Sequence, residues 1–201
     1  MKTAAALAAC SLIALTAAAC QRETGGAEDQ ENQAVNAVQD HAAGVVGAAA
    51  GPAGAMTSAM FVSNAAIGGM YEVEAGRIAA ERSKNPRVRA LGQTMVTDHG
   101  KANEELKSVA AAANLTVPTA LDERHRGMID NLRGATDQDF DRVYLQQQEA
   151  AHNETGLLLE TYGRMGDNEA LKGWAGKTLP VVRHHQEMVD QLDEANADAA
   201  R

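Results

Sequence analysis

The stretch PRVRALGQTMVTDHGKANEELKSVAAAAN, residues 86–114, decides the fold. Its apolar and small residues recur at alternating steps of four and three, which is typical of one buried face of a long helix. Asn85 suits the N-cap and Pro86 the first helical position, so we expect a helix from residue 86 to about residue 114. His99 falls at the centre of the buried face. That face consists of Val88, Gly92, Met95, His99, Ala102, Leu106, Val109 and Ala113.

Three further segments show helical periodicity, at about residues 58–83, 138–165 and 168–195. Thr57 and Ser58 are suitable N-cap residues for the first of them, and Thr136 or Asp137 for the second. Pro180 lies within the last segment and is expected to kink or divide that helix. More than twenty residues separate the two middle helices, and they carry a short helix whose His125 we interpret as structural.

The composition favours close-packed helices over a sheet. Hydrophobic residues make up 45% of the chain but aromatic residues only 3%, and there are four prolines. The first two long helices are joined by a short turn, as are the last two, whereas the middle connection is long. We therefore expect an all-α, ferritin-like four-helix bundle with a long middle crossover that carries a short extra helix. A simple up-down-up-down bundle is the alternative.

The N-terminal residues predict export. Residues 1–19 resemble a signal peptide, and LTAAAC, residues 15–20, resembles a lipoprotein processing site that ends at Cys20. We predict lipidation of Cys20, a Gly/Ala-rich tether over residues 20–57, the bundle over residues 58–195 and a tail over residues 196–201. The predicted partner is a membrane, reached through this lipid anchor, and the predicted location is the periplasm, at the outer membrane. The alternative is simple cleavage near Ala19, which would release the protein into the periplasm.

Charge and cysteine content exclude two classes of function. The formal net charge of -9 gives no electrostatic basis for nucleic-acid binding. Both cysteines, Cys10 and Cys20, lie in the N-terminal segment, so the predicted bundle has neither a disulfide nor thiol chemistry.

Four polar residues on the inner faces of the four helices are candidate metal ligands: Glu74, His99, His152 and His185. Measured from the turn between the first two helices, the heights of Glu74 and His99 along the bundle differ by roughly 6 Å, or one helical turn, at about 1.5 Å per residue. The heights of His152 and His185, measured from the turn between the last two helices, differ by about the same amount. The four side chains are therefore expected to meet near the middle of the bundle. Burial without partners would cost a few kcal/mol for each group, so either a metal ion or a closed hydrogen-bond network should compensate them.

Four neighbouring residues are candidates for orienting these ligands. Asp98 precedes His99, Glu149 and His152 form a Glu-x-x-His motif, and Glu187 follows His184 at a spacing of three. A carboxylate beside a ligating imidazole fixes its tautomer. Imidazole and carboxylate ligands suit zinc, iron, copper or manganese, and the residues do not distinguish among these metals.

Three motifs in order carry a family resemblance: DH followed by Leu106, FDRVY followed by His152, and LPVVRHH at residues 179–185. With these, residues 58–192 resemble the bacterial domain of unknown function 4142. The resemblance implies a ferritin-like bundle in exported proteins, many of them of the lipoprotein type, without an established reaction. Related di-iron proteins use two Glu-x-x-His motifs, but here Val96 and Val182 occupy the places of the other carboxylates. Ferroxidase, oxygenase and manganese-catalase chemistry is therefore disfavoured.

Three hypotheses about function follow from these residues. The first is an exported ferritin-like protein that binds a transition metal in the bundle core, with a role in the cell envelope or in stress protection. The second is a metal-dependent oxidoreductase acting on peroxide or oxygen. The third is a structural or interaction bundle without a metal. The sequence leaves open whether the protein is an enzyme.

Overall fold

The computed structural model describes residues 56–199, which contain five helices. The predicted signal peptide, Cys20 and nearly all of the predicted tether lie outside the described residues. Within residues 56–199, none of the helices combines the length and the hydropathy that a membrane-crossing helix requires. The helices are α2 (Ser58–Arg82), α3 (Pro86–Ala112), α4 (Glu123–Gly134), α5 (Phe140–Met165) and α6 (Glu169–Ala199).

Side-chain caps set the start of most helices. Thr57 accepts a hydrogen bond from the Met60 amide at the start of α2, and Asn85 accepts one from the Arg87 amide at the start of α3. Helix α5 begins at Phe140, two residues after the predicted start, because residues 136–139 form a turn, and neither Thr136 nor Asp137 is its N-cap. Thr136 Oγ1 accepts from the Asp139 amide within that turn, so it caps the turn rather than the helix.

Helix α6 differs from its prediction at two points. It extends to Ala199, beyond the predicted end at residue 195, and of the two outcomes expected at Pro180, a kink or a division, the division does not occur. Proline removes the hydrogen bond to the carbonyl four residues earlier, which belongs to Gly176. Both Pro180 and Gly176 are exposed, so water can bond to that carbonyl and the helix continues.

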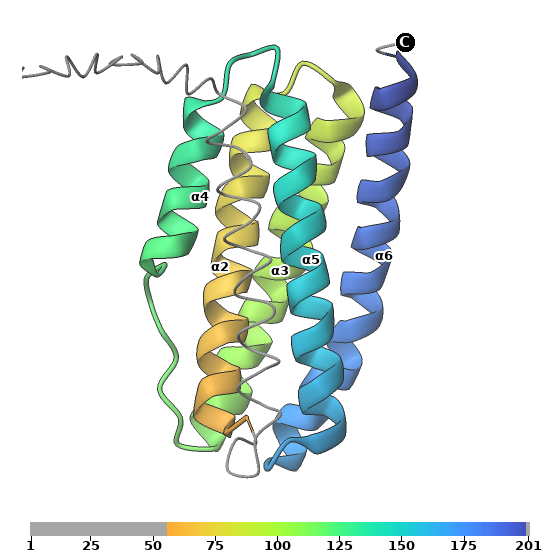
Figure 1. Ribbon diagram of the computed structural model, residues 1–201. Coiled ribbons are helices and arrows are strands. Elements are labelled where there is room, and N and C mark those ends of the chain that lie inside the picture. The colour runs from red at the N-terminus through yellow and green to blue at the C-terminus, as the bar shows by residue number, and fades with distance from the viewer. Residues whose placement is uncertain (1–55, 200–201) are drawn as a thin grey trace, which may run out of the picture.

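The long connection between α3 and α5 crosses the bundle from one end to the other (Figure 1). Chain direction reverses from α2 to α3, and residues 113–139, which include α4, return the chain to the end where α3 began. Helix α5 consequently runs parallel to α3, and α2 and α6 each pack against both of them. This confirms the ferritin-like arrangement and excludes the up-down-up-down alternative.

Helices α2 and α3 are in close backbone contact at a pair of glycines. A Cβ atom on Gly76 would lie 2.7 Å from the carbonyl oxygen of Gly92, and one on Gly92 would lie 2.5 Å from that of Gly76. Neither position can hold a side chain at this distance, so the close contact of the first two helices depends on both glycines.

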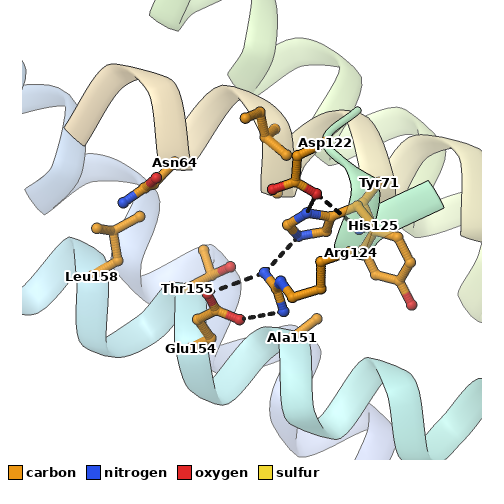
Figure 2. Close-up of a pocket in the computed structure, with 11 residues that line it drawn as sticks. Asn64, Tyr71, Asp122, Arg124, His125, Ala151, Glu154, Thr155 and Leu158 are labelled. Atoms are coloured by element: carbon orange, nitrogen blue, oxygen red, sulfur yellow. Dashed lines mark hydrogen bonds and ion pairs between the residues drawn. The ribbon is translucent and has the colours of Figure 1, made fainter. Parts of the chain in front are cut away.

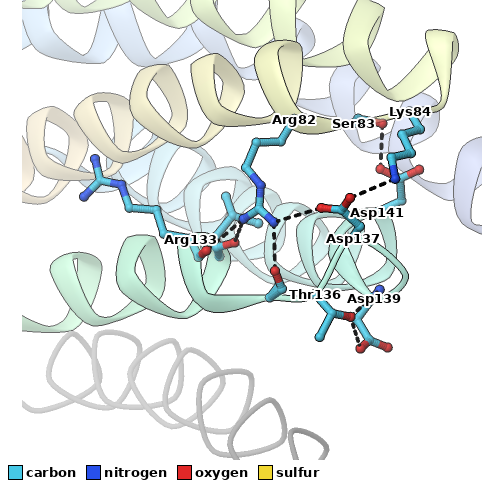
Figure 3. Close-up of polar contacts among 10 residues, drawn as sticks. Arg82, Ser83, Lys84, Arg133, Thr136, Asp137, Asp139 and Asp141 are labelled. Atoms are coloured by element: carbon cyan, nitrogen blue, oxygen red, sulfur yellow. Dashed lines mark hydrogen bonds and ion pairs between the residues drawn. The ribbon is translucent and has the colours of Figure 1, made fainter.

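Arg82, at the end of α2, fixes the end of α4 (Figure 3). Its guanidinium donates to the carbonyl oxygens of Leu132, Arg133 and Ala135 at 2.8–2.9 Å and lies 4.6 Å from the centre of the Phe140 ring. A cation at a helix C-terminus satisfies carbonyls that have no partner within the helix. Arg82 thereby holds the crossover against the main bundle.

The apolar core is divided into two clusters along the bundle. One contains Tyr71, Met95 and Val189, and the other contains Phe61, Leu106 and Val182. His99 lies between Met95 and Leu106 in sequence, and His185 lies between Val182 and Val189. A buried polar layer therefore interrupts the core at the level of these histidines.

Candidate metal centre

Three histidines from three helices meet in this polar layer. His99 on α3, His152 on α5 and His185 on α6 are 6%, 1% and 1% exposed. Their ring centroids lie 5.2–5.5 Å apart. One ring nitrogen of each lies within 4.8 Å of the corresponding nitrogens of the other two. The structure thus brings together three of the four candidate ligands predicted from the sequence.

Hydrogen bonds outside the cluster fix the tautomers of two of the rings. His152 Nδ1 donates to the Gln148 carbonyl at 2.8 Å, and His185 Nε2 donates to Asp98 Oδ2 at 2.9 Å. Since both acceptors lack a hydrogen, the proton must sit on the named nitrogen, which leaves a lone pair on His152 Nε2 and on His185 Nδ1. Those two atoms and His99 Nε2 are buried and have no hydrogen-bond partner among the described residues.

The surroundings keep all three imidazoles neutral. Burial lowers the pKa of His99 well below its usual value and lowers the pKa of His152 to about 4. Burial also lowers the pKa of His185, although Asp98 acts in the opposite direction. Neutral imidazole is the form that binds metal ions, so the cluster is ready to coordinate at neutral pH without first losing protons.

Glu74 does not join the three histidines, which corrects the prediction from the sequence. Its side chain is 29% exposed and forms ion pairs with Arg77 at 2.6 Å and Arg133 at 2.7 Å. The carboxylate that reaches the polar layer belongs to Glu72, which is 2% exposed. Two residues along a helix turn the side chain by about 200°, so the two glutamates lie on opposite faces of α2.

The sequence contained a signal for Glu72 that our interpretation of the first helix missed. A stripe at steps of three and four runs through it, and every member is buried: Phe61, Ala65, Gly69, Glu72, Gly76 and Ala79. The face that carries Glu74 also carries Met60, which is 48% exposed. Ala and Gly occur on several faces of this helix, so the hydrophobic periodicity of the sequence does not identify which face is buried.

Glu72 takes part in a buried network behind His152. Gln148 Nε2 donates to Glu72 Oε2 at 2.7 Å, and Tyr144 donates to Gln148 Oε1 at 3.3 Å. Glu72 Oε1 has no hydrogen-bond partner among the described residues and lies 3.7 Å from His152 Nδ1. Burial raises the pKa of Glu72 to about 8, so the carboxyl group is protonated at neutral pH.

The four candidate orienting residues divide into one near the cluster and three on the surface. Asp98 is hydrogen-bonded to His185 rather than to the adjacent His99. Glu149 is exposed, so the Glu-x-x-His motif does not place a carboxylate beside His152. His184 and Glu187 form a surface pair at 3.7 Å, with side chains 69% and 72% exposed.

The donor set is three neutral imidazole nitrogens without a carboxylate. A tetrahedral zinc ion holds its ligand atoms roughly 3.4 Å apart when its bonds are about 2.1 Å long. The three ring nitrogens lie within 4.8 Å of one another, so small rotations of the rings would bring them to this spacing. The residues therefore fit a single transition-metal ion. They do not fit a di-iron carboxylate centre, which needs several carboxylates.

Fold and site together define a ferritin-like helical bundle with a buried three-histidine cluster. A family model described as "Domain of unknown function (DUF4142)" matches residues 43–192, which is most of the chain, and the protein belongs to this family. No curated protein matches the chain, and no solved structure matches it. The function must therefore be argued from the site itself.

Proposed function

We propose that the protein binds one transition-metal ion through His99, His152 and His185. The observation that carries the proposal is the convergence of three buried imidazole rings, each with one buried nitrogen that has no hydrogen-bond partner among the described residues. In two of these rings the other nitrogen is bonded to an acceptor outside the cluster. Such outside acceptors are typical of metal-ligating histidines, where they fix the ring and increase its basicity. Gln148 and Asp98 have this role here.

A hydrogen-bond network without metal accounts less well for the same atoms. Each neutral imidazole has one N–H group, and His152 and His185 use theirs outside the cluster. Only His99 could donate a hydrogen bond within the cluster, so at least one of the two buried lone pairs, on His152 Nε2 and His185 Nδ1, would have no donor. A buried unmatched polar atom costs about 1–3 kcal/mol, and a metal cation removes this cost at all three positions.

The biological role that we propose is metal binding or stress protection in the cell envelope. It rests on the N-terminal residues, where Cys20 follows an apolar segment that resembles a signal peptide. Lipidation of Cys20 would hold the bundle at the outer membrane, facing the periplasm. Mass spectrometry of the mature N-terminus tests this part, because an acylated Cys20 and a free N-terminus near residue 20 differ in mass.

Elemental analysis of the full chain, purified without an affinity tag and without chelators, tests metal binding. We expect one equivalent of zinc, copper, iron or manganese, lost in His99→Ala, His152→Ala and His185→Ala. His184→Ala is the matched control, because this neighbouring side chain is 69% exposed and should leave the metal content unchanged. A metal-free protein that also fails to take up these four ions would refute the proposal.

A metal-dependent oxidoreductase acting on peroxide or oxygen is the second candidate. Three protein ligands leave one coordination position of a tetrahedral ion to water or a small molecule, as in catalytic metal sites. Burial of all three rings restricts such a substrate to the size of peroxide or oxygen. Peroxide consumption by the metal-loaded chain, absent in His185→Ala, would support this candidate, and a loaded but inactive protein would exclude it.

A further inference from the structure

A second site lies on the side of the bundle where α2, α4 and α5 meet (Figure 2). It is a partly enclosed cavity of about 190 Å³ that shares no lining residue with the three histidines. At about 30 Å³ for each water in the liquid, this is room for a ligand of about five to eight non-hydrogen atoms. Asp122 and Thr155 lie on facing walls, and Ile67 and Leu158 provide apolar surface.

A chain of polar contacts fixes the charges on one wall. Asp122 Oδ1 accepts from the backbone amide and from Nδ1 of His125, at 2.8 Å and 2.7 Å. The Arg124 guanidinium donates to His125 Nε2 at 2.8 Å and forms an ion pair with Glu154 at 3.1 Å. Because arginine can only donate, His125 Nε2 carries no proton and the ring is neutral. Two carboxylates and one guanidinium then leave the cavity with a net charge of -1.

Four polar groups of the lining make no hydrogen bond within residues 56–199: Asp122 Oδ2, the Asn64 amide, the Thr155 hydroxyl and Arg124 Nη1. The charge of Arg124 is nevertheless paired, because Nη1 lies 3.1 Å from Glu154 Oε2. Burial raises the pKa of Asp122, but the hydrogen bonds from His125 outweigh burial and lower it overall, so the carboxylate is ionised at neutral pH. The free acceptor on this wall is therefore a charged one.

We propose that this cavity binds a small organic cation, a primary ammonium group on a short aliphatic body. An ammonium group offers three donors and no acceptor, which matches Asp122 Oδ2, the Thr155 hydroxyl oxygen and the Asn64 amide oxygen. The aliphatic body lies against Ile67 and Leu158. A carboxylate ligand is disfavoured, because Asp122 and Glu154 repel it and Glu154 already neutralises the charge of the Arg124 guanidinium.

The test is calorimetric titration of the full chain with n-butylammonium, with butyrate and n-butanol as probes of similar shape and different charge. We expect saturable millimolar binding of n-butylammonium and at least tenfold weaker binding of the other two. Asp122→Asn keeps an N-cap residue before α4 but removes the charge, so it should weaken n-butylammonium at least fivefold.

Gly68→Leu should block the cavity. A Cβ at Gly68 lies 3.8 Å from Thr155 Oγ1, an ordinary contact, so the backbone tolerates the side chain while its branched end fills the cavity. Gly127→Leu on α4 is the matched control, because nothing lies within 4 Å of a Cβ there. Unchanged binding in Gly68→Leu, equal binding of butyrate, or no binding of n-butylammonium would each overturn the proposal.

Discussion

Replacement of Glu72 by glutamine should change how the stability of the metal-free protein depends on pH. The folded-state pKa of this carboxyl group is raised from 4.5 to about 8 by burial. A carboxyl group with a raised pKa contributes stability that is fully present below its unfolded pKa and is lost as the pH rises through the folded pKa. The Glu72→Gln side chain retains an acceptor for Gln148 and cannot ionise, so the substitution removes this dependence.

The magnitude follows from the two pKa values. Between pH 6.5 and pH 8.5 the unfolded chain has already lost this proton, whereas the folded protein retains it until about pH 8. With 1.36 kcal/mol for each pKa unit, the wild type should lose about 2 kcal/mol over this interval relative to Glu72→Gln. The three histidines also change stability over this interval, but they do so equally in both proteins, so their effect cancels in the comparison.

Urea unfolding of both proteins at pH 6.5 and pH 8.5, with chelator present, measures the effect. Glu74→Gln is the control, because Glu74 is on the opposite, partly exposed face of α2 and should leave the wild-type difference unchanged. If wild type and Glu72→Gln lost the same stability between the two pH values, Glu72 would not be a protonated group of the polar layer. The account of the network behind His152 would then be wrong.

Three further predictions concern packing, the crossover and the metal. Gly92→Ala should destabilise the bundle by about 1–3 kcal/mol in thermal unfolding, since its Cβ would lie 2.5 Å from a carbonyl oxygen of α2, whereas Gly173→Ala has open space and should be neutral or stabilising. Arg82→Lys should cost about 1–2 kcal/mol in urea unfolding, because one ammonium group cannot serve three carbonyls, and equal stability would contradict the capping role. Asp98→Asn should weaken zinc affinity about tenfold in a chelator competition, because His185 loses its charged acceptor, and unchanged affinity would argue against metal ligation by His185.

The fold was predictable because each long helix carries its own local signals. Asn85 and Pro86 mark the start of α3, and the four-and-three period through Met95, His99 and Leu106 marks its buried face. The unequal connection lengths then specified the crossover. Thr136 misled the prediction of α5, because a residue that caps a helix also caps a tight turn, and the two differ only in how the chain continues.

The candidate site was predictable where the helix face was unambiguous. His99, His152 and His185 lie on helices whose larger apolar residues define one side, and the structure brings these three together. Glu72 was missed because α2 carries alanine and glycine on several faces, so its period did not identify the buried one. The Asp98–His185 contact joins α3 to α6, and a pairing between distant helices requires the packed bundle to be known.

The three histidines of the polar layer come from both helical hairpins of the bundle. His99 belongs to the α2–α3 hairpin, whereas His152 and His185 belong to the α5–α6 hairpin. These hairpins are joined in sequence only by the long crossover, so a shared metal ion would link two units that otherwise meet through side-chain packing and hydrogen bonds such as Asp98–His185. An ion that binds only the folded arrangement stabilises it by about 2.7 kcal/mol at a hundredfold excess over its dissociation constant. Under the proposed metal binding, coordination by these three residues would couple metal occupancy to the assembly of the two halves of the bundle, and this coupling would account for histidines in an apolar core.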